Sequence, residues 1–92
     1  MQVLHVRNHL EILSLSGTIS SDGSCHLHIS LANEHGEVIG GHLLGEAIVH
    51  TTAEVAMAFS NDILLQRSLD IHTGYKELTA TSVDLSTVQE NL

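Results

Sequence analysis

The sequence predicts a small, mostly antiparallel β domain, and three observations favour this class. Apolar residues alternate with polar ones over much of the first half of the chain, which is the period of a strand with one buried face. Clusters of turn-forming residues, such as Ser21-Asp22-Gly23, separate the alternating stretches. The chain has 92 residues, so we expect residues 1–92 to form one domain with a thin core that association would stabilise.

Two strands are predicted in the first third of the chain. Residues 11–20 interleave β-branched and apolar residues with serines, and Gly17 is expected to bend or bulge that strand. Residues 25–33 alternate without interruption, so their leucines and isoleucine share one face, which we expect to be the core face. His26 and His28 then lie on the opposite face.

Residues 47–59 allow two interpretations. The alanines permit a helix, whereas the valine, isoleucine, threonine and phenylalanine content favours a long strand. We predict the strand, and its apolar content on both sides would drive subunits together. A further short strand is predicted at residues 63–69, followed by a turn at residues 70–74.

A hairpin is predicted between the second strand and the glycine pair that follows it. If the loop has three residues and Gly36 takes the positive-φ position, Asn33 pairs with Glu37 and the register is fixed. Counting back from that pair places His42 directly opposite His28. The two imidazoles then lie on the same face of the hairpin.

His26 completes a group of three histidines on this face. It lies two residues from His28, about 7 Å away between Cα atoms, and points the same way. Three neutral imidazole nitrogens are the ligand set of a catalytic-type zinc centre, which leaves a fourth position for water or substrate. We therefore predict His26, His28 and His42 as zinc ligands.

The register also has alternatives. A loop of two or four residues, or a bulge at Gly40 and Gly41, would shift the pairing by one and turn His42 to the opposite face. The histidines would then be polar residues on the outer face of a hairpin. No role is assigned to the remaining histidines, which are His5, His9, His35, His50 and His72.

Charge and cysteine content exclude several classes of protein. Three Lys and Arg against eleven Asp and Glu give a net charge of −8, which repels a phosphate backbone. The single cysteine, Cys25, cannot form an intrachain disulfide. No apolar run reaches the length of a signal peptide or a membrane span. We expect a soluble cytoplasmic protein without membrane partners.

Several segments resemble, in the same order, the PPC domain (plants and prokaryotes conserved). They are EILSLSGTIS at 11–20, HLHISLA at 26–32, HGEVIGGHLL at 35–44, TTAEV at 51–55, RSLD at 67–70 and TGYKEL at 73–78. The resemblance covers about residues 10–78 and implies an α+β domain with little helix, built on an antiparallel sheet and assembling as a homotrimer. Family members usually carry an N-terminal helix and further strands first, so the chain looks like a truncated bacterial-type member.

The fold that this resemblance implies is also similar to that of acetolactate decarboxylase, a zinc enzyme. Its metal is held by a His-x-His pair and a later histidine, and His26, His28 and His42 match that pattern residue by residue. On position alone, Glu54 is a candidate acid or base and Arg67 a candidate anion-binding residue. The alternatives are a solvated carboxylate for Glu54 and a surface ion pair for Arg67.

Three functions from different classes follow. The first is a homotrimeric assembly or regulatory module, with or without a metal site, and the second is a zinc-dependent lyase or hydrolase. Whether the chain is an enzyme stays open. The third, a DNA-associated protein, is disfavoured because plant members of the PPC family bind DNA through a basic AT-hook, and this chain has no proline and only three basic residues.

We predict that the chain does not bind duplex DNA tightly. With so few cations to release counterions, the dissociation constant at physiological salt should be about 10⁻⁴ M or weaker. Electrophoretic mobility shift with duplex DNA measures this. Tight, sequence-selective binding would contradict the prediction.

Overall fold

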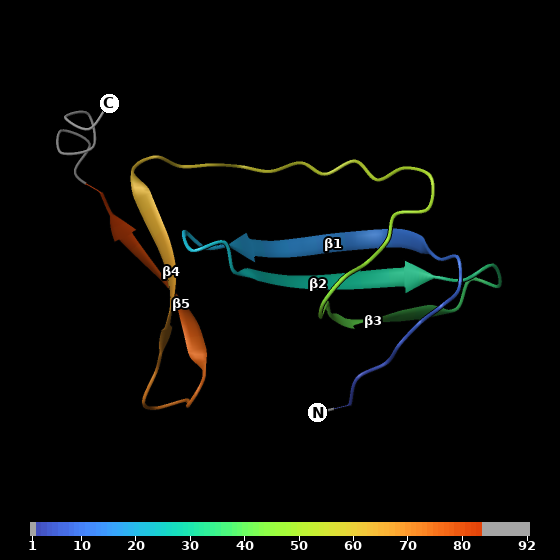
Figure 1. Ribbon diagram of the computed structural model, residues 1–92, viewed down its shortest axis with the longest axis horizontal. Coiled ribbons are helices and arrows are strands. Elements are labelled where there is room, and N and C mark those ends of the chain that lie inside the picture. The colour runs from blue at the N-terminus through green and yellow to red at the C-terminus, as the bar shows by residue number, and fades with distance from the viewer. Residues whose placement is uncertain (1, 84–92) are drawn as a thin grey trace. The chain divides into compact units, whose positions relative to one another are not determined.

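The fold was analysed in a computed structural model, which describes residues 2–83. Five strands form two sheets (Figure 1), a three-stranded sheet in the order β1-β2-β3 and a two-stranded sheet of β4 and β5. The described residues divide into two compact units: residues 2–17 with His26–Ala53 form the first, and Thr18–Cys25 with residues 54–83 form the second. The strands are β1 Glu11–Ile19, β2 Cys25–Ala32, β3 Val38–His42, β4 Ile63–Leu69 and β5 Lys76–Ser82.

The antiparallel sheet is confirmed, but the helical part of the expected α+β class is not found. Residues 2–83 contain strands, turns and irregular segments without a helix. Serine, threonine and β-branched residues alternating at a period of two give the chain no continuous apolar stripe of helical spacing. Within the same residues there is accordingly no helix of the length and apolarity that a membrane span requires.

The first two strands lie where the alternation predicts them, within one or two residues at their ends. The turn that joins them is fixed by Asp22, whose carboxylate accepts hydrogen bonds from the backbone nitrogen of Ser24 at 2.9 Å and from its hydroxyl at 2.7 Å. The backbone nitrogen of Gly23 also donates to the carbonyl of Ser20 at 2.9 Å. A short polar side chain that satisfies the turn backbone is the usual basis of such a reversal.

The predicted hairpin register between β2 and β3 is confirmed. The carboxamide oxygen of Asn33 accepts hydrogen bonds from the backbone nitrogens of His35 and Glu37, both at 2.9 Å, and so closes a three-residue loop. Gly36 takes a φ of +78° in that loop, a conformation that glycine adopts at little cost. The pairing then runs back to His28 opposite His42.

The strand predicted at residues 47–59 is wrong. These residues have no regular secondary structure, and all of them are exposed. A strand needs a neighbouring edge to accept and donate hydrogen bonds, and in the described part of the chain no backbone hydrogen bond involves residues 44–61. Residue preference for the extended conformation is therefore not enough to form a strand here.

The second sheet is a hairpin of β4 and β5. The predicted strand at 63–69 and the turn at 70–74 are confirmed, and the pairing runs from Ile63 opposite Ser82 to Leu69 opposite Lys76. Asp70 organises the turn, because its carboxylate accepts from the backbone nitrogen of His72 at 2.7 Å. The turn is thus built on an aspartate, as is the turn between β1 and β2.

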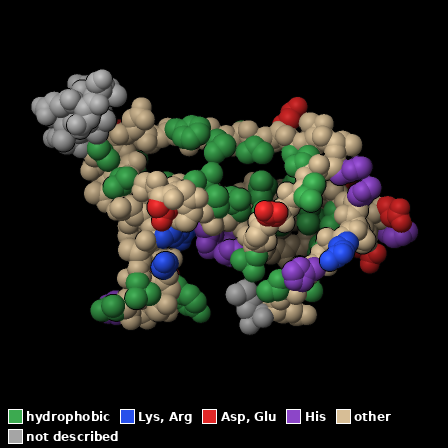
Figure 2. Space-filling model, viewed as in Figure 1, with side chains coloured by type: hydrophobic (Ala, Val, Ile, Leu, Met, Phe, Trp, Pro, Cys, Tyr) green, Lys and Arg blue, Asp and Glu red, His purple; other side chains and the backbone are tan. Residues whose placement is uncertain are grey.

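The residues that the structure describes do not enclose a hydrophobic core. None of their apolar side chains is buried, and the expected core face of β2 at Leu27, Ile29 and Leu31 is half-buried. Hydrophobic side chains are correspondingly visible on the surface in Figure 2. Ile48 and Phe59 are 93% and 84% exposed. This much exposed apolar surface is unusual for a soluble monomer and typical of a surface that another chain covers.

The hydrogen bonds in the turn at Asp22 predict a lowered pKa for its carboxyl group, which can be measured. The hydrogen bonds from the backbone nitrogen and then the hydroxyl of Ser24 favour the ionised carboxylate and lower its pKa below the ordinary 3.8. We expect the carboxyl carbon of Asp22 to titrate below 3.8 in an NMR pH series, and Ser24→Ala to raise the midpoint. The hydrogen bonds to ionised Asp22 therefore stabilise the fold above the pKa that Asp22 has in the unfolded chain. This stabilisation is lost as the pH falls through the lower pKa of Asp22 in the folded chain. Identical midpoints in the two proteins would contradict the assignment.

Candidate metal centre

The three predicted histidines meet on one face of the β2–β3 hairpin. His26 and His28 are two residues apart on β2, so their side chains leave the same side of the strand. His42, the last residue of β3, is the register partner of His28. The hairpin does not end there, because the backbone nitrogen of Leu43 donates to the carbonyl of Leu27 at 2.9 Å. Backbone pairing on both sides of this register therefore fixes where the side chains of His28 and His42 originate.

The imidazole rings form a nearly equilateral group. Their centroids are 5.1 Å apart for His26 and His28, 4.7 Å for His26 and His42, and 5.3 Å for His28 and His42. Each pair meets edge to face, with interplanar angles of 62° to 68°. One nitrogen from each ring can be chosen so that all three lie within 4.8 Å of one another. The rings are gathered around a common point rather than spread along the strand.

The three rings are close enough together to hold a metal ion. With Zn–N bonds of about 2.0–2.1 Å, the ring centroids of neighbouring imidazole ligands lie about 5 Å apart, close to the separations of these three rings. His26 is half-buried, whereas His28 and His42 are exposed, so the group opens to solvent on one side. Among the described residues this is the group of three or more histidine, cysteine or carboxylate side chains that is close enough to hold an ion.

Gly40 lets β3 lie close to β2 beside the site. A Cβ atom on Gly40 would lie 2.8 Å from the carbonyl oxygen of Ile29, so only glycine allows this approach of β3 to β2 without a shift. Gly40 pairs with Ser30 and Gly41 pairs with Ile29, so the register does not change through the two glycines. The bulge that would have moved His42 to the opposite face is absent from this pairing.

Glu54 and Arg67 belong to the second unit, whereas the three histidines belong to the first. Glu54 is exposed on the irregular segment. Arg67 is half-buried on β4 and donates a hydrogen bond to the hydroxyl of Thr18 at 3.1 Å. That bond is to a neutral hydroxyl rather than to a carboxylate.

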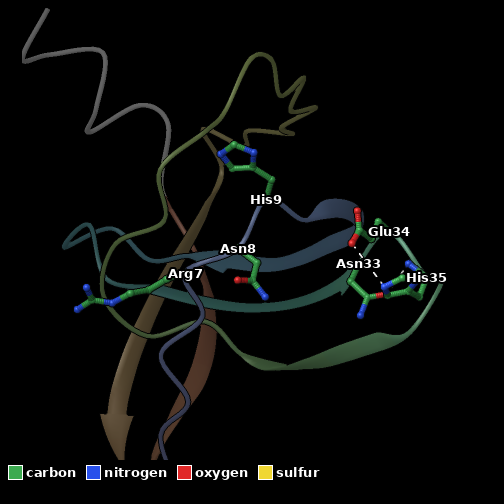
Figure 3. A pocket seen from close by; sticks show the side chains of 6 residues that line it. All are labelled: Arg7, Asn8, His9, Asn33, Glu34 and His35. Atoms are coloured by element: carbon green, nitrogen blue, oxygen red, sulfur yellow. Dashed lines mark hydrogen bonds and ion pairs between the residues drawn. The ribbon is translucent and has the colours of Figure 1, made fainter.

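The structure also brings together polar residues for which no role was predicted. The imidazoles of His9 and His50 stack with centroids 3.9 Å apart and planes 14° from parallel. His9 further lines an open hollow of about 560 Å³ between the N-terminal segment and the β2–β3 loop. Figure 3 shows that the Arg7 side chain points away from the loop residues of this hollow. The lining residues are Arg7, Asn8, His9, Asn33, Glu34 and His35.

The hollow lacks the features of a metal or catalytic site. Its one ion pair joins the neighbours Glu34 and His35 at 3.4 Å, and both side chains are largely exposed. The carboxamide oxygen of Asn33 already accepts two hydrogen bonds from the loop backbone. No sequence signal places the N-terminal segment beside this loop, because the segment has no regular structure.

The geometry defines the class of the protein. It is a mostly antiparallel β domain with a group of three histidines on one hairpin. Residues 1–60 match the Plants and Prokaryotes Conserved (PCC) domain, the family also written PPC, and the chain belongs to it. The match contains all three histidines.

Two curated relatives are each called "Bifunctional protein GlmU", from Synechococcus sp. strains JA-2-3B'a(2-13) and JA-3-3Ab. Each is 45% identical over 69 residues, which is 75% of this chain. The aligned part is only 11% of the length of either relative.

Proposed function

We propose that this chain is a PCC-domain assembly module that forms homotrimers and holds a zinc ion at His26, His28 and His42. The convergence of three imidazoles from two adjacent strands carries the proposal for the metal. The exposed apolar surface carries the proposal for assembly. The relatives add support for a modular role, because in each of them a stretch similar to this chain is a small part of a longer protein.

Zinc suits the ligand set better than magnesium or calcium, because imidazole nitrogen is a borderline-soft donor and those ions prefer oxygen. When bound, a zinc ion with three imidazole ligands supplies a Lewis-acid position open to water or to a substrate oxygen. His26 would hold the ion from the half-buried side of the group, and His28 and His42 from the exposed side.

A zinc-dependent lyase or hydrolase is the second candidate function. The observation that favours it is the number of ligands, since three imidazoles leave an open position, whereas structural zinc sites use four protein ligands. Such an enzyme also needs an acid or base beside the metal. Glu54 was a candidate for that role on sequence position alone, and it is assigned no catalytic role.

Assembly is favoured because large apolar side chains of the irregular segment are in water. Burying one side chain such as Ile48 or Phe59 fully contributes about 1.5–3 kcal/mol. Among the described residues, the backbone groups of the same segment pair with no other backbone group, and an added strand edge could satisfy them. A trimer would therefore cover apolar surface and pair this backbone in one step.

We predict a homotrimer of about 30 kDa, three times the 9.9 kDa of the chain, in sedimentation or light-scattering measurements. Ile48→Ser should weaken assembly, because Ile48 lies in the irregular segment and is 93% exposed. Ile71→Ser is the matched control, since Ile71 is 87% exposed but lies in the β4–β5 turn.

A folded monomer at micromolar concentration would overturn the assembly proposal. A dimer would correct its stoichiometry. Equal loss of assembly in the two isoleucine variants would remove the irregular segment from the interface.

We predict one zinc ion per chain in protein purified without a histidine tag. His28→Ala should lower zinc affinity by more than about 100-fold, because it removes a ligand, and loss of an outer-shell partner alone costs about 10–100-fold. His35→Ala is the control, since His35 is also an exposed histidine, lies in the hairpin loop and has its imidazole beside the carboxylate of Glu34. Metal analysis and competition with a chromophoric chelator measure both effects.

Equal affinity in the two histidine variants would show that zinc binds elsewhere or adventitiously. Turnover is a separate question, because a chain that binds zinc without any lyase or hydrolase activity supports the module and not the enzyme.

A further inference from the structure

We propose that Gly17 is a positioning residue for the zinc ligand His26. The inference rests on the proposed zinc site and concerns how the fold presents one of its three ligands. Gly17 lies on β1, and its contact is with the backbone of His26 rather than with the metal or the imidazole ring.

The contact is closer than any side chain allows. A Cβ atom built on Gly17 would lie 1.9 Å from the carbonyl oxygen of His26, 2.9 Å from its carbonyl carbon and 2.9 Å from the Cα atom of Leu27. Real Cβ atoms essentially never come within 3.0 Å of another heavy atom in this way. All three neighbours are backbone atoms, so no side-chain rotation can relieve the overlap. An alanine at this position therefore requires β1 and β2 to move relative to each other by more than 1 Å.

We expect the end of β2 that carries His26 to be the part that moves. The register of β2 with β3 begins at His28, and the backbone nitrogen of Leu43 donates to the carbonyl of Leu27 beyond it. The other strand bonded to β2 is β1, which carries Gly17. The two strands cannot simply separate, because the backbone nitrogen of Ser20 donates to the carbonyl of Ser24 at 2.9 Å, just beyond this point.

A displacement of this size matters at a metal site. Metal–ligand distances must agree with their ideal values to within about 0.2 Å. The carbonyl group and the side chain of His26 share one Cα atom, so a shift of the carbonyl moves the imidazole too. His28 and His42 are paired directly with each other and keep their places. Alanine at position 17 should therefore remove one ligand of three.

Gly41 provides a control for the backbone cost of the substitution. Its φ of +155° is nearly the same as the +156° of Gly17, so an alanine meets the same conformational penalty at either position. A Cβ atom on Gly41 meets nothing within 4 Å, and Gly41 directly precedes the ligand His42. The two variants differ in the steric contact alone.

The experiment compares zinc binding by the wild-type chain, Gly17→Ala and Gly41→Ala. We expect Gly17→Ala to lower zinc affinity by more than about 100-fold, as the loss of a ligand in His28→Ala does, and Gly41→Ala to retain the wild-type affinity. Chelator competition gives the affinities. In ¹⁵N-histidine NMR spectra, zinc should shift the ring signals of all three ligands in the wild type and in Gly41→Ala. In Gly17→Ala it should shift those of His28 and His42 only.

A purely structural role of Gly17 predicts a different result. It would lower stability without singling out the His26 ring signal, so equal shifts of the three ligands in Gly17→Ala would overturn the inference. So would matching affinities of the two glycine variants, or a Gly17→Ala chain that loses its strand signal in circular dichroism. A wild-type chain that binds no zinc would instead refute the metal site itself.

Discussion

The three-residue loop between β2 and β3 is the constraint on which the candidate site depends. Its geometry is set by one side chain, because Asn33 accepts two backbone hydrogen bonds through its carboxamide oxygen and donates to the Glu37 carboxylate at 3.0 Å through its nitrogen. Every pair in the hairpin follows from this closure. Since side chains alternate between faces, a change of one residue in the loop would move His42 away from His28. A polar side chain far from the imidazoles thus decides whether they meet.

The features that depend on neighbouring residues could be predicted from the sequence. Strict alternation located β2, and the spacing of Asn33, Gly36 and Glu37 gave the register that brings the histidines together. Strand β5 was not predicted as a strand, although Leu78 and Ala80 alternate with polar residues there. Its pairing with β4 needs only the six-residue connection at 70–75, which contains the predicted turn, so the signal was present but weak.

The features that depend on distant partners could not be predicted. Residues 47–59 have the composition of a strand, but whether they form one is decided by an edge that pairs with them, which alternation does not reveal. The stacking of His9 on His50 has the same origin, since neither residue lies in a regular element whose period would place it. From the sequence, Gly17 was expected only to bend or bulge its strand. Its close approach to His26 was not predicted.

Among the described residues, the backbone of residues 44–61 makes no hydrogen bond to other backbone groups, and this affects how long the chain would survive in a cell. Amide groups without hydrogen-bond partners exchange with solvent quickly, and an exposed extended segment is the conformation that proteases bind and cleave. Subunits that covered this segment would protect it. Unassembled copies would then be degraded faster than assembled ones, so that the amount of intact protein would follow the extent of assembly.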